Sequence, residues 1–329
     1  MSSTGIPAVH ERLSSVLTDT RGVPREPASL ATRLRYVAVI RRIEFMPVIF
    51  TVATMPAVLG AQEWREVFSL NAFLAVIWAI LGLQIGNMTN ALAARELDAA
   101  GEKPRMSDAI YGLGVSRVVA EIVVSTVVQC VLAVYLAVRT EHWGLLGIAV
   151  VAGLIGFQYS VPPLHLKSAG VPQLPALQLD IVFLPGLFVL YSFDHALDWS
   201  KVVTVAGFAL VLTSLFVTSH AEDYFEDRQL GFNTYPVALG LARALYVQSA
   251  MLFVGSVYEE FGFTWGLVVY VVAWLVSQRF LFTVIRDVRG VPTEDAVAAL
   301  HRKSLIGPYH SALMGWSSLA MAALALSGW

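Results

Sequence analysis

Long apolar stretches, separated by short polar connections, make up most of the chain after about residue 40. Nine such stretches lie near residues 43–61, 68–94, 114–138, 144–160, 173–193, 202–222, 243–258, 264–284 and 306–328. A helix of about 20 apolar residues spans the roughly 30 Å of hydrocarbon in a bilayer. Because a β-barrel shows short alternating segments instead, the pattern predicts an all-α, polytopic membrane protein with nine transmembrane helices.

Composition and the polar beginning of the chain indicate how it is organised. Of the 329 residues, 57% are hydrophobic and 14% are charged, whereas soluble domains carry about 25% charged residues. The first 35 residues lack the apolar run of a signal peptide, so we expect residues 1–35 to form a largely disordered cytosolic tail. Residues 36–329 then form one membrane domain. The single cysteine, Cys130, excludes an intrachain disulfide bond.

Lysine and arginine residues are distributed unevenly between the two sides of the predicted helices. All but three of the 22 lie in the N-terminal tail, in the loops after even-numbered segments or at the flanking helix ends, the exceptions being Arg65, Arg139 and Lys201. The positive-inside rule then places the N-terminus, and the ends of segments two and six, in the cytosol. We expect an integral protein of the bacterial plasma membrane, and these topological charges give no support to a nucleic-acid partner.

The second apolar segment ends in polar residues. Four residues spaced to share one face of a helix are Asn87, Asn90, Ala94 and Asp98. Two amides and a carboxylate on one face supply the oxygen ligands that Mg²⁺ prefers, and Lys103 and Arg105 follow in position to meet anionic oxygens. The alternative interpretation is a helix end whose polar side chains reach into solvent.

The sixth segment ends in acidic residues. Asp223 and Asp227 are four residues apart and therefore share a helix face, where like charges destabilise each other unless a cation lies between them. A divalent cation would convert this repulsion into affinity. The alternative is an acidic, solvated helix end. In segment five, Asp180 is an ionisable residue within an apolar span, which is a functional hypothesis because burying a charge is costly. The alternative is a structural hydrogen bond to a neighbouring helix.

Three stretches together carry a resemblance to the UbiA-type intramembrane prenyltransferase superfamily. The first two resemble its Asn-x-x-x-Asp-x-x-x-Asp element after helix two and its Asp-x-x-x-Asp element after helix six, which continues here as Gly-x-x-Thr-x-Pro-Val-x-Leu-Gly over residues 231–240. Residues 159–167, Tyr-Ser-Val-Pro-Pro-Leu-His-Leu-Lys, resemble the family's Tyr-Ser-x-Pro-Pro-Leu-Arg-Leu-Lys element after helix four. With nine predicted helices, the resemblance covers the chain from about residue 40 to the end.

The resemblance implies nine helices around an open-sided central cavity, with two Mg²⁺ ions holding an isoprenyl diphosphate at a cytosolic mouth. The residues that match the family's metal-binding positions are Asn90, Asp98, Asp223 and Asp227. The residues expected to contact the diphosphate or to assist at the mouth are Lys103, Arg105, Lys167 and Tyr159, with Asn87, His220 and Arg228 as further candidates. The prenyl tail would lie in the apolar part of the cavity, within the membrane lipid.

The chain also departs from the family pattern at several positions. Ala94 stands where the middle aspartate of the first element is expected, and Ser219 and His220 replace the leading Asn-Asp pair of the longer second element. Asn233 and His165 stand where basic residues are common. Since each lost carboxylate weakens the field that gathers Mg²⁺, these departures are consistent with tolerated substitution, with a specialised reaction or with lost activity.

The leading functional prediction is a Mg²⁺-dependent prenyltransferase of quinone, haem or secondary metabolism. It ionises an isoprenyl diphosphate and transfers the prenyl group to a lipophilic or aromatic acceptor, which Asp180 orients or deprotonates. The alternative within the same fold is a terpene cyclase, in which the cation is attacked by its own double bonds. A transporter is the alternative from another class, but the chain shows no pair of repeated halves with broken helices.

Overall fold

The computed structural model describes residues 29–100, 104–229, 231–259, 266–289, 300 and 306–329, with only the backbone of residues 96–100 and 104. Most of the expected N-terminal tail therefore lies outside the described residues. Helix α2 begins at Leu30, so the predicted boundary at residue 35 falls within a helix. This helix is capped by Ser29, whose hydroxyl accepts a hydrogen bond from the N–H of Thr32 at 3.2 Å.

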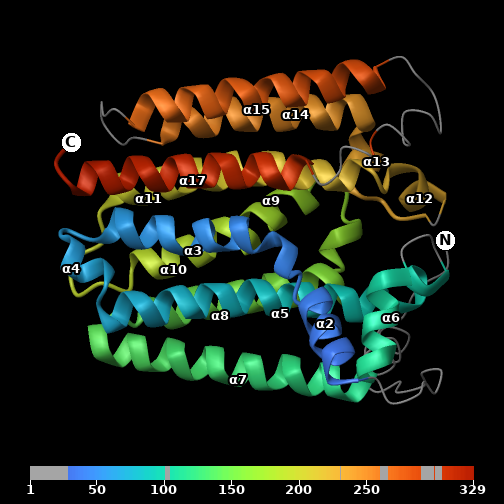
Figure 1. The fold of residues 1–329 in the computed structure, drawn as a ribbon, viewed down its shortest axis with the longest axis horizontal. Helices are drawn as coiled ribbons and strands as arrows, with labels where there is room; N and C mark the ends of the chain where they lie inside the picture. Colours follow the sequence, from blue (N-terminus) through green and yellow to red (C-terminus); the bar gives the residue numbers. More distant parts are fainter. Residues whose placement is uncertain (1–28, 101–103, 230, 260–265, 290–299, 301–305) are drawn as a thin grey trace.

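Regular structure is entirely helical across the described residues (Figure 1). In the first half, the elements are α2 Leu30–Ile40, η1 Ile43–Phe45, α3 Met46–Gly60, α4 Trp64–Val67, α5 Leu70–Ala100, α6 Pro104–Leu113, α7 Val115–Thr140 and α8 Gly144–Ser160. In the second half, they are η2 Leu166–Ser168, α9 Gln173–Gln178, η3 Leu179–Phe183, α10 Leu184–Leu190, α11 Trp199–Phe216, η4 Val217–Ala221, α12 Tyr224–Gln229, α13 Tyr235–Leu239, α14 Leu241–Tyr258, α15 Gly266–Val288 and α17 Ile306–Leu326.

Each of the nine predicted apolar segments coincides with helical structure, and the prediction of an all-α membrane protein is confirmed. Six spans of the described residues are long and apolar enough to cross a bilayer, namely Ile43–Gly60, Leu70–Arg95, Val115–Thr140, Gln173–Leu190, Trp199–Ala221 and Gly266–Val288. Helix α8 is a shorter apolar helix. The number of nine transmembrane helices therefore stays a prediction.

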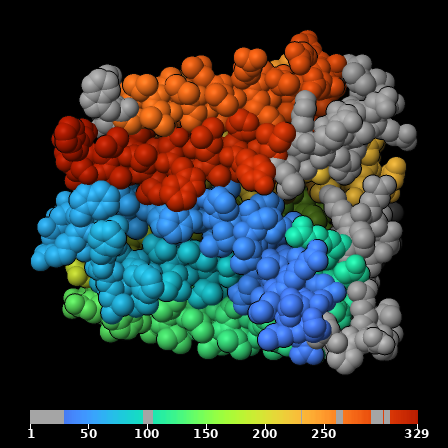
Figure 2. Space-filling model, viewed as in Figure 1, coloured from blue at the N-terminus to red at the C-terminus, as the bar shows by residue number. Residues whose placement is uncertain are grey.

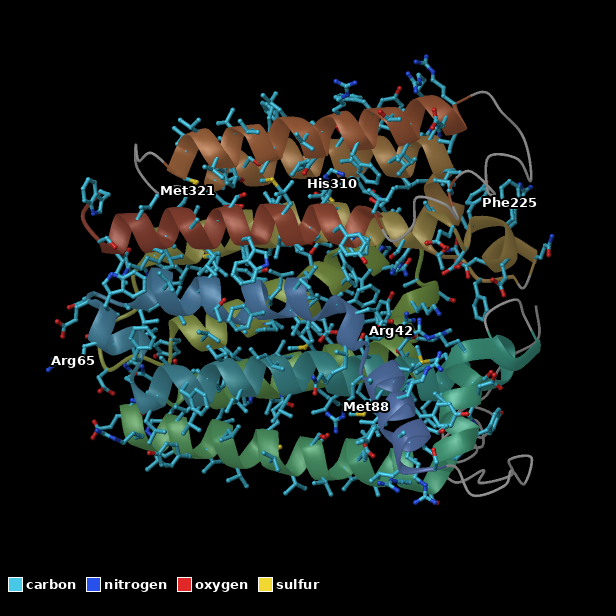
Figure 3. All side chains as sticks on the ribbon, in the orientation of Figure 1. Arg42, Arg65, Met88, Phe225, His310 and Met321 are labelled. Atoms are coloured by element: carbon cyan, nitrogen blue, oxygen red, sulfur yellow. The ribbon has the colours of Figure 1, made fainter. Side chains whose placement is uncertain are left out.

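The long helices run roughly parallel, with α14 and α15 at one side of the bundle and α7 at the other (Figure 1). Helices α2, α6, α12 and α13 gather at one end, which we call the polar end; α4 lies at the opposite end (Figure 1). Figure 3 shows the same polarity, with Arg42 toward the polar end and Arg65 at the other. Helix α3 packs against α5, α10, α11 and α17, so it lies in the interior of the bundle.

An ion-pair network fixes the corner where α2 leads into the membrane-spanning α3. Arg41 donates to Gln84 Oε1 on α5 at 2.7 Å, and its other terminal nitrogen lies 3.4 Å from Glu121 on α7. Arg117 is 3.7 Å from the same carboxylate, one helical turn away. Arg42 follows with a left-handed backbone (φ 51) where the chain bends from α2 into α3, and its side chain lines the central cavity.

Candidate functional site

A cavity of about 360 Å³ lies between α3, α5, α8, the α9–η3 segment and the η4–α12 segment. Its polar lining consists of Arg42, Asn87, Asn90, Tyr159, Lys167, Gln173, Asp180, Ser219, His220, Glu222, Asp223, Asp227 and Thr234. Its apolar lining consists of Phe45, Val48, Ile49, Val52, Leu83, Leu177, Ile181 and Phe216, with glycines at 82, 86 and 156. Most of the polar residues belong to the polar end of the bundle, so the cavity has a polar mouth and a mainly apolar interior.

One side of the mouth, which we call the acidic wall, is formed by η4 and α12. Asp227 has an exposed fraction of only 8%, and its Oδ2 accepts a hydrogen bond from the Thr234 hydroxyl at 2.9 Å. Burial raises the pKa of Asp227 to about 6, against the lowering effect of that hydrogen bond, and the charge of Asp223 raises it further. A carboxylate held in this way is stabilised by any cation that binds between the two aspartates.

The opposite side of the mouth, the amide wall, is formed by α5. Asn87 and Asn90 lie one turn apart on the cavity side of this helix, as their spacing predicted. The Ser160 hydroxyl lies 3.3 Å from Asn90 Oδ1 and donates to it, which leaves that oxygen a second lone pair facing other partners. Two uncharged oxygen donors therefore face the cavity across from two carboxylates.

The buried amide of Gln173, at the start of α9, joins three elements behind the mouth. Its Oε1 accepts the backbone N–H of Tyr235 at 2.7 Å, which fixes the orientation of the amide. Its Nε2 then lies 2.9 Å from the hydroxyl of Tyr159 and 3.3 Å from Nδ1 of His220. With Nε2 as donor, Nδ1 of neutral His220 is an acceptor and the imidazole proton is on the other ring nitrogen. Gln173 thus orients two side chains of the cavity wall.

A π-helical turn places Asp180 on the cavity wall. The segment η3, Leu179–Phe183, widens the helix between α9 and α10, and such single turns are frequent at functional sites. The carboxylate contacts α8 at Gly156, where a Cβ atom would lie 2.8 Å from Oδ1 of Asp180. Since this is closer than a side-chain carbon approaches an oxygen, the acid fits here because residue 156 is glycine.

The structure brings eight of the twelve predicted site residues together at this cavity. These eight are Asn87, Asn90, Tyr159, Lys167, Asp180, His220, Asp223 and Asp227. Arg105 and Arg228 are exposed and are absent from the described cavity lining. For Arg228 the reason is its position one residue after Asp227, which rotates it about 100° around α12. The side chain of Asp98, and Lys103, lie outside the described residues.

Sequence reasoning missed Arg42, Gln173 and Thr234, which also line the cavity. Arg42 stands among several basic residues before the first apolar segment, where all of them indicate only topology. Thr234 belongs to the Gly-x-x-Thr-x-Pro-Val-x-Leu-Gly stretch that carries the family resemblance, and this motif is the signal that could have found it. Gln173 follows an ordinary Val-Pro pair at a helix start, and its role arises from long-range contacts.

The donor set at the mouth fits a cation that prefers oxygen ligands. The described donors at the mouth are the carboxylates of Glu222, Asp223 and Asp227 and the amide oxygens of Asn87 and Asn90, which are the ligand types of Mg²⁺. Among the described residues, no group of three or more His, Cys, Asp and Glu side chains forms a metal cluster. The charge for a cation therefore comes mainly from the acidic wall, while the amides add ligands without charge.

The fold and the site together define a class, that of helical intramembrane proteins whose cavity has a polar, oxygen-lined mouth and a mainly apolar interior. Neither a protein-family model nor a curated protein matches the chain. Solved structures do match it, and they identify the fold as that of UbiA homologues. The prediction from the sequence motifs is thereby confirmed at the level of the fold.

Three of these structures illustrate the likeness. A UbiA homologue from Archaeoglobus fulgidus bound to GPP and Mg²⁺ aligns with a TM-score of 0.59 and 17% identity, covering 87% of this chain and 99% of that one. Digeranylgeranylglyceryl phosphate synthase aligns with a TM-score of 0.57 and 14% identity over 89% and 99% of the two chains. An apo UbiA homologue from Aeropyrum pernix K1 gives 0.57 and 17% over 86% and 98%.

Proposed function

We propose that this protein is a Mg²⁺-dependent intramembrane enzyme that ionises an isoprenyl diphosphate and transfers the prenyl group to a lipophilic or aromatic acceptor. The observation that carries the proposal is a single cavity with an oxygen-lined, acidic mouth and an apolar interior. This division suits a molecule with a metal-bound diphosphate head and a hydrocarbon tail. UbiA homologues of the same fold have been solved with DMAPP or GPP and Mg²⁺ bound, which supports the choice of ligand.

Substrate binding at the mouth follows from the two walls. Asn90, Asp223 and Asp227 would hold Mg²⁺, which when bound draws off negative charge from the diphosphate oxygens. The described cations at the cavity, Arg42 and Lys167, are placed to contact the same oxygens. We retain Asp98, Lys103 and Arg105 as predicted members of this group on the strength of the sequence motif.

The chemical step takes place at the boundary between the polar mouth and the apolar interior. The bond from the first prenyl carbon to oxygen breaks, its electron pair leaves with the diphosphate, and an allylic cation remains in a dry, apolar space. A nucleophilic atom of the acceptor attacks this cation and then loses a proton. Asp180 lies on the same wall and is the described carboxylate placed to receive that proton.

A terpene cyclase is the second candidate, and the position of Asp180 favours it. Because this carboxylate belongs to the same cavity wall as the apolar lining, it can accept a proton from a cyclised cation without any acceptor molecule. Both candidates require the same ionisation and the same mouth. They differ in whether a second substrate must enter the cavity.

The proposal is tested by incubating the purified full chain in lipid nanodiscs with allylic isoprenyl diphosphates and Mg²⁺, with and without a panel of aromatic and quinol acceptors. We expect diphosphate release and a prenylated acceptor, both abolished by chelation. Cyclic hydrocarbons formed without acceptor would replace the transferase with the cyclase. Tight Mg²⁺-dependent binding with no release of diphosphate under any condition would show a non-catalytic lipid-binding protein instead.

A further inference from the structure

We propose that α2 is an interfacial helix that binds the lipid leaflet at the polar end of the bundle. Leu30 and Leu34 enter the acyl region, and Arg33 and Arg35 bind the head groups of anionic phospholipids. This surface lies outside the cavity, so its role is independent of the reaction that the cavity supports. The direction of α2, the level at which it is held and the side chains around it support the proposal.

Helix α2 runs across the other helices. The long helices of the bundle are roughly parallel, whereas α2 crosses them near the polar end (Figure 1). Its 11 residues extend about 16 Å at 1.5 Å per residue, which is too short to span a bilayer. In Figure 2 the dark-blue atoms at the start of the described chain lie on the outer surface near the polar end. Helix α2 therefore lies along the side of the bundle and does not extend the first span.

The ion pair after α2 shows the level at which the helix is held. Arg41 directly follows α2 and lies 3.4 Å from Glu121 on α7. After Glu121, the sequence of α7 has no charged residue until Arg139. These 17 residues extend about 25 Å, which is close to the roughly 30 Å thickness of the hydrocarbon layer. Glu121 therefore marks the boundary between head groups and acyl chains, and the C-terminal end of α2 is fixed at this boundary.

The face of α2 that points away from the protein is apolar. Val39 and Ile40 are buried in a cluster with residues of α5 and α6. Leu34 lies about 140° and 120° around the helix from these two residues, and Leu30 is one turn before Leu34. The exposed fractions are 75% for Leu30 and 62% for Leu34. A single exposed leucine needs no partner, but an outward apolar stripe on a helix at this level is typical of insertion into a lipid interface.

Two arginines flank the apolar stripe. Arg33 precedes Leu34 and Arg35 follows it, so they lie about 100° to either side of that leucine, and both are exposed. Their flexible stems let the guanidinium groups reach from the stripe to the head-group region, where each can donate two parallel hydrogen bonds to a phosphate. An apolar stripe between two cations is complementary to a leaflet that contains anionic phospholipids.

The depth of α2 is measured with spin labels on the full chain in lipid nanodiscs. Cys130→Ala removes the only cysteine, and single labels are then attached through Leu34→Cys, Val131→Cys in the middle of α7, or Glu63→Cys at the end opposite the polar end. The protein leaves the three native side chains similarly exposed, Leu34 at 62%, Val131 at 61% and Glu63 at 55%. Collisions with oxygen, which partitions into lipid, and with a water-soluble nickel chelate therefore report the surroundings of each label.

The label at residue 34 should lie about 5–10 Å below the head groups, between the mid-span label and the water-exposed one. Nickel access equal to that at residue 63 would place α2 in water. Low access to both reagents would show that another part of the chain covers the leucines. Either result overturns the proposal. Turnover is not measured, so a failure of the proposed function would not imitate these outcomes.

Head-group preference is measured with a bimane fluorophore on Leu34→Cys and with brominated lipids as quenchers. Brominated phosphatidylglycerol should bind beside the label about fivefold more tightly than brominated phosphatidylcholine, and salt should weaken this preference. Arg33→Gln with Arg35→Gln should remove the preference, whereas Arg65→Gln, which changes an exposed arginine at the opposite end, should keep it. Melting temperatures check the folding of each variant. Equal binding of the two lipids, or a preference that survives loss of both arginines, would overturn the proposal.

Discussion

The two walls of the cavity mouth offer oxygen atoms of different charge. The acidic wall carries Asp223 and Asp227 on the η4–α12 segment, whereas the described part of the amide wall carries Asn87 and Asn90 on α5. Each wall presents two oxygen donors about one turn apart, Asn87 and Asn90 within α5, and Asp223 just before α12 with Asp227 on it. The difference is that only the first supplies negative charge among the described side chains.

In the proposed metal-binding mouth, one side would supply charge and the other would supply uncharged ligands. Amide oxygens are adequate ligands for Mg²⁺, but they do not attract it from solution as carboxylates do. The pKa of Asp227 is raised to about 6 because burial, together with the nearby charge of Asp223 on the same wall, destabilises its carboxylate. A bound cation would stabilise that carboxylate. Removing an oxygen donor from the acidic wall should therefore lower activity more than removing one from the amide wall.

The largest effect is expected from the acidic wall. Asp227→Asn keeps the shape of the side chain but removes its charge, and we expect diphosphate release to fall by roughly 100-fold or more. Asn90→Ala, on the amide wall, should lower it by about tenfold. Rates at saturating Mg²⁺, with melting temperatures as a check on folding, compare the two. An equal or larger loss in Asn90→Ala would remove the distinction between the walls.

A smaller effect is expected from the amide behind the acidic wall. Gln173→Glu can still accept the N–H of Tyr235 but no longer donates to Tyr159 and His220, so turnover should fall about tenfold as these side chains lose their orientation. A double-mutant cycle with Tyr159→Phe should show non-additive losses. Strict additivity would indicate that Gln173 supports the fold alone, and a kept melting temperature serves as the control.

The amide wall can be given the charge that it lacks. Ala94 lies one turn after Asn90 on α5, and Ala94→Asp should raise Mg²⁺ affinity by up to about tenfold by adding a carboxylate near the mouth. Ala93→Asp places the same group about 100° around the helix and is the matched control. Titration of Mg²⁺ by calorimetry measures both. A changed product profile, or lower activity, in Ala94→Asp would indicate that Ala94 belongs to a specialised reaction.

The smallest effect is a dependence of stability on pH in the metal-free protein. Since the folded pKa of Asp227, about 6, lies above its ordinary 3.8, its contribution is fully present below about pH 4 and is lost as pH rises through about 6. Water at the mouth reduces this to about 1 kcal/mol. Denaturation at pH 5 and pH 7 should show the loss in the wild type but not in Asp227→Asn. At pH 7, Mg²⁺ should restore stability only to the wild type.

Much of the fold could be predicted from the sequence because a bilayer imposes helices of known length and polarity. Segments of about 20 apolar residues located the long helices, and spacings of three and four residues placed Asn87 with Asn90 and Asp223 with Asp227. What spacing could not give is the side of the bundle that each helix turns toward the cavity. That depends on contacts between distant elements, such as the amide of Gln173 with Tyr159 and Tyr235.

The predicted basic residues show the same limit. Lys167 reaches the cavity lining from η2, whereas Arg105 on α6 is exposed, although both follow a polar helix end in the sequence. Arg42, which lies before the first span, lines the cavity because a left-handed residue turns the chain there. Charge near a helix end therefore predicted the correct end of the bundle without predicting the individual side chain.

The π-helical turn at Leu179–Phe183 has a consequence for how such proteins diverge. A turn of this kind amounts to one residue inserted into an α-helix, so the loss of a single codon would restore the regular helix. Because the wide turn absorbs the extra residue, the flanking helices would keep their facing while the residues within Leu179–Phe183 shift around the axis, and Asp180 would leave the space that Gly156 provides. A protein of this fold with an inward-facing acid at this position and one without it can thus differ by a single in-frame deletion instead of a series of substitutions.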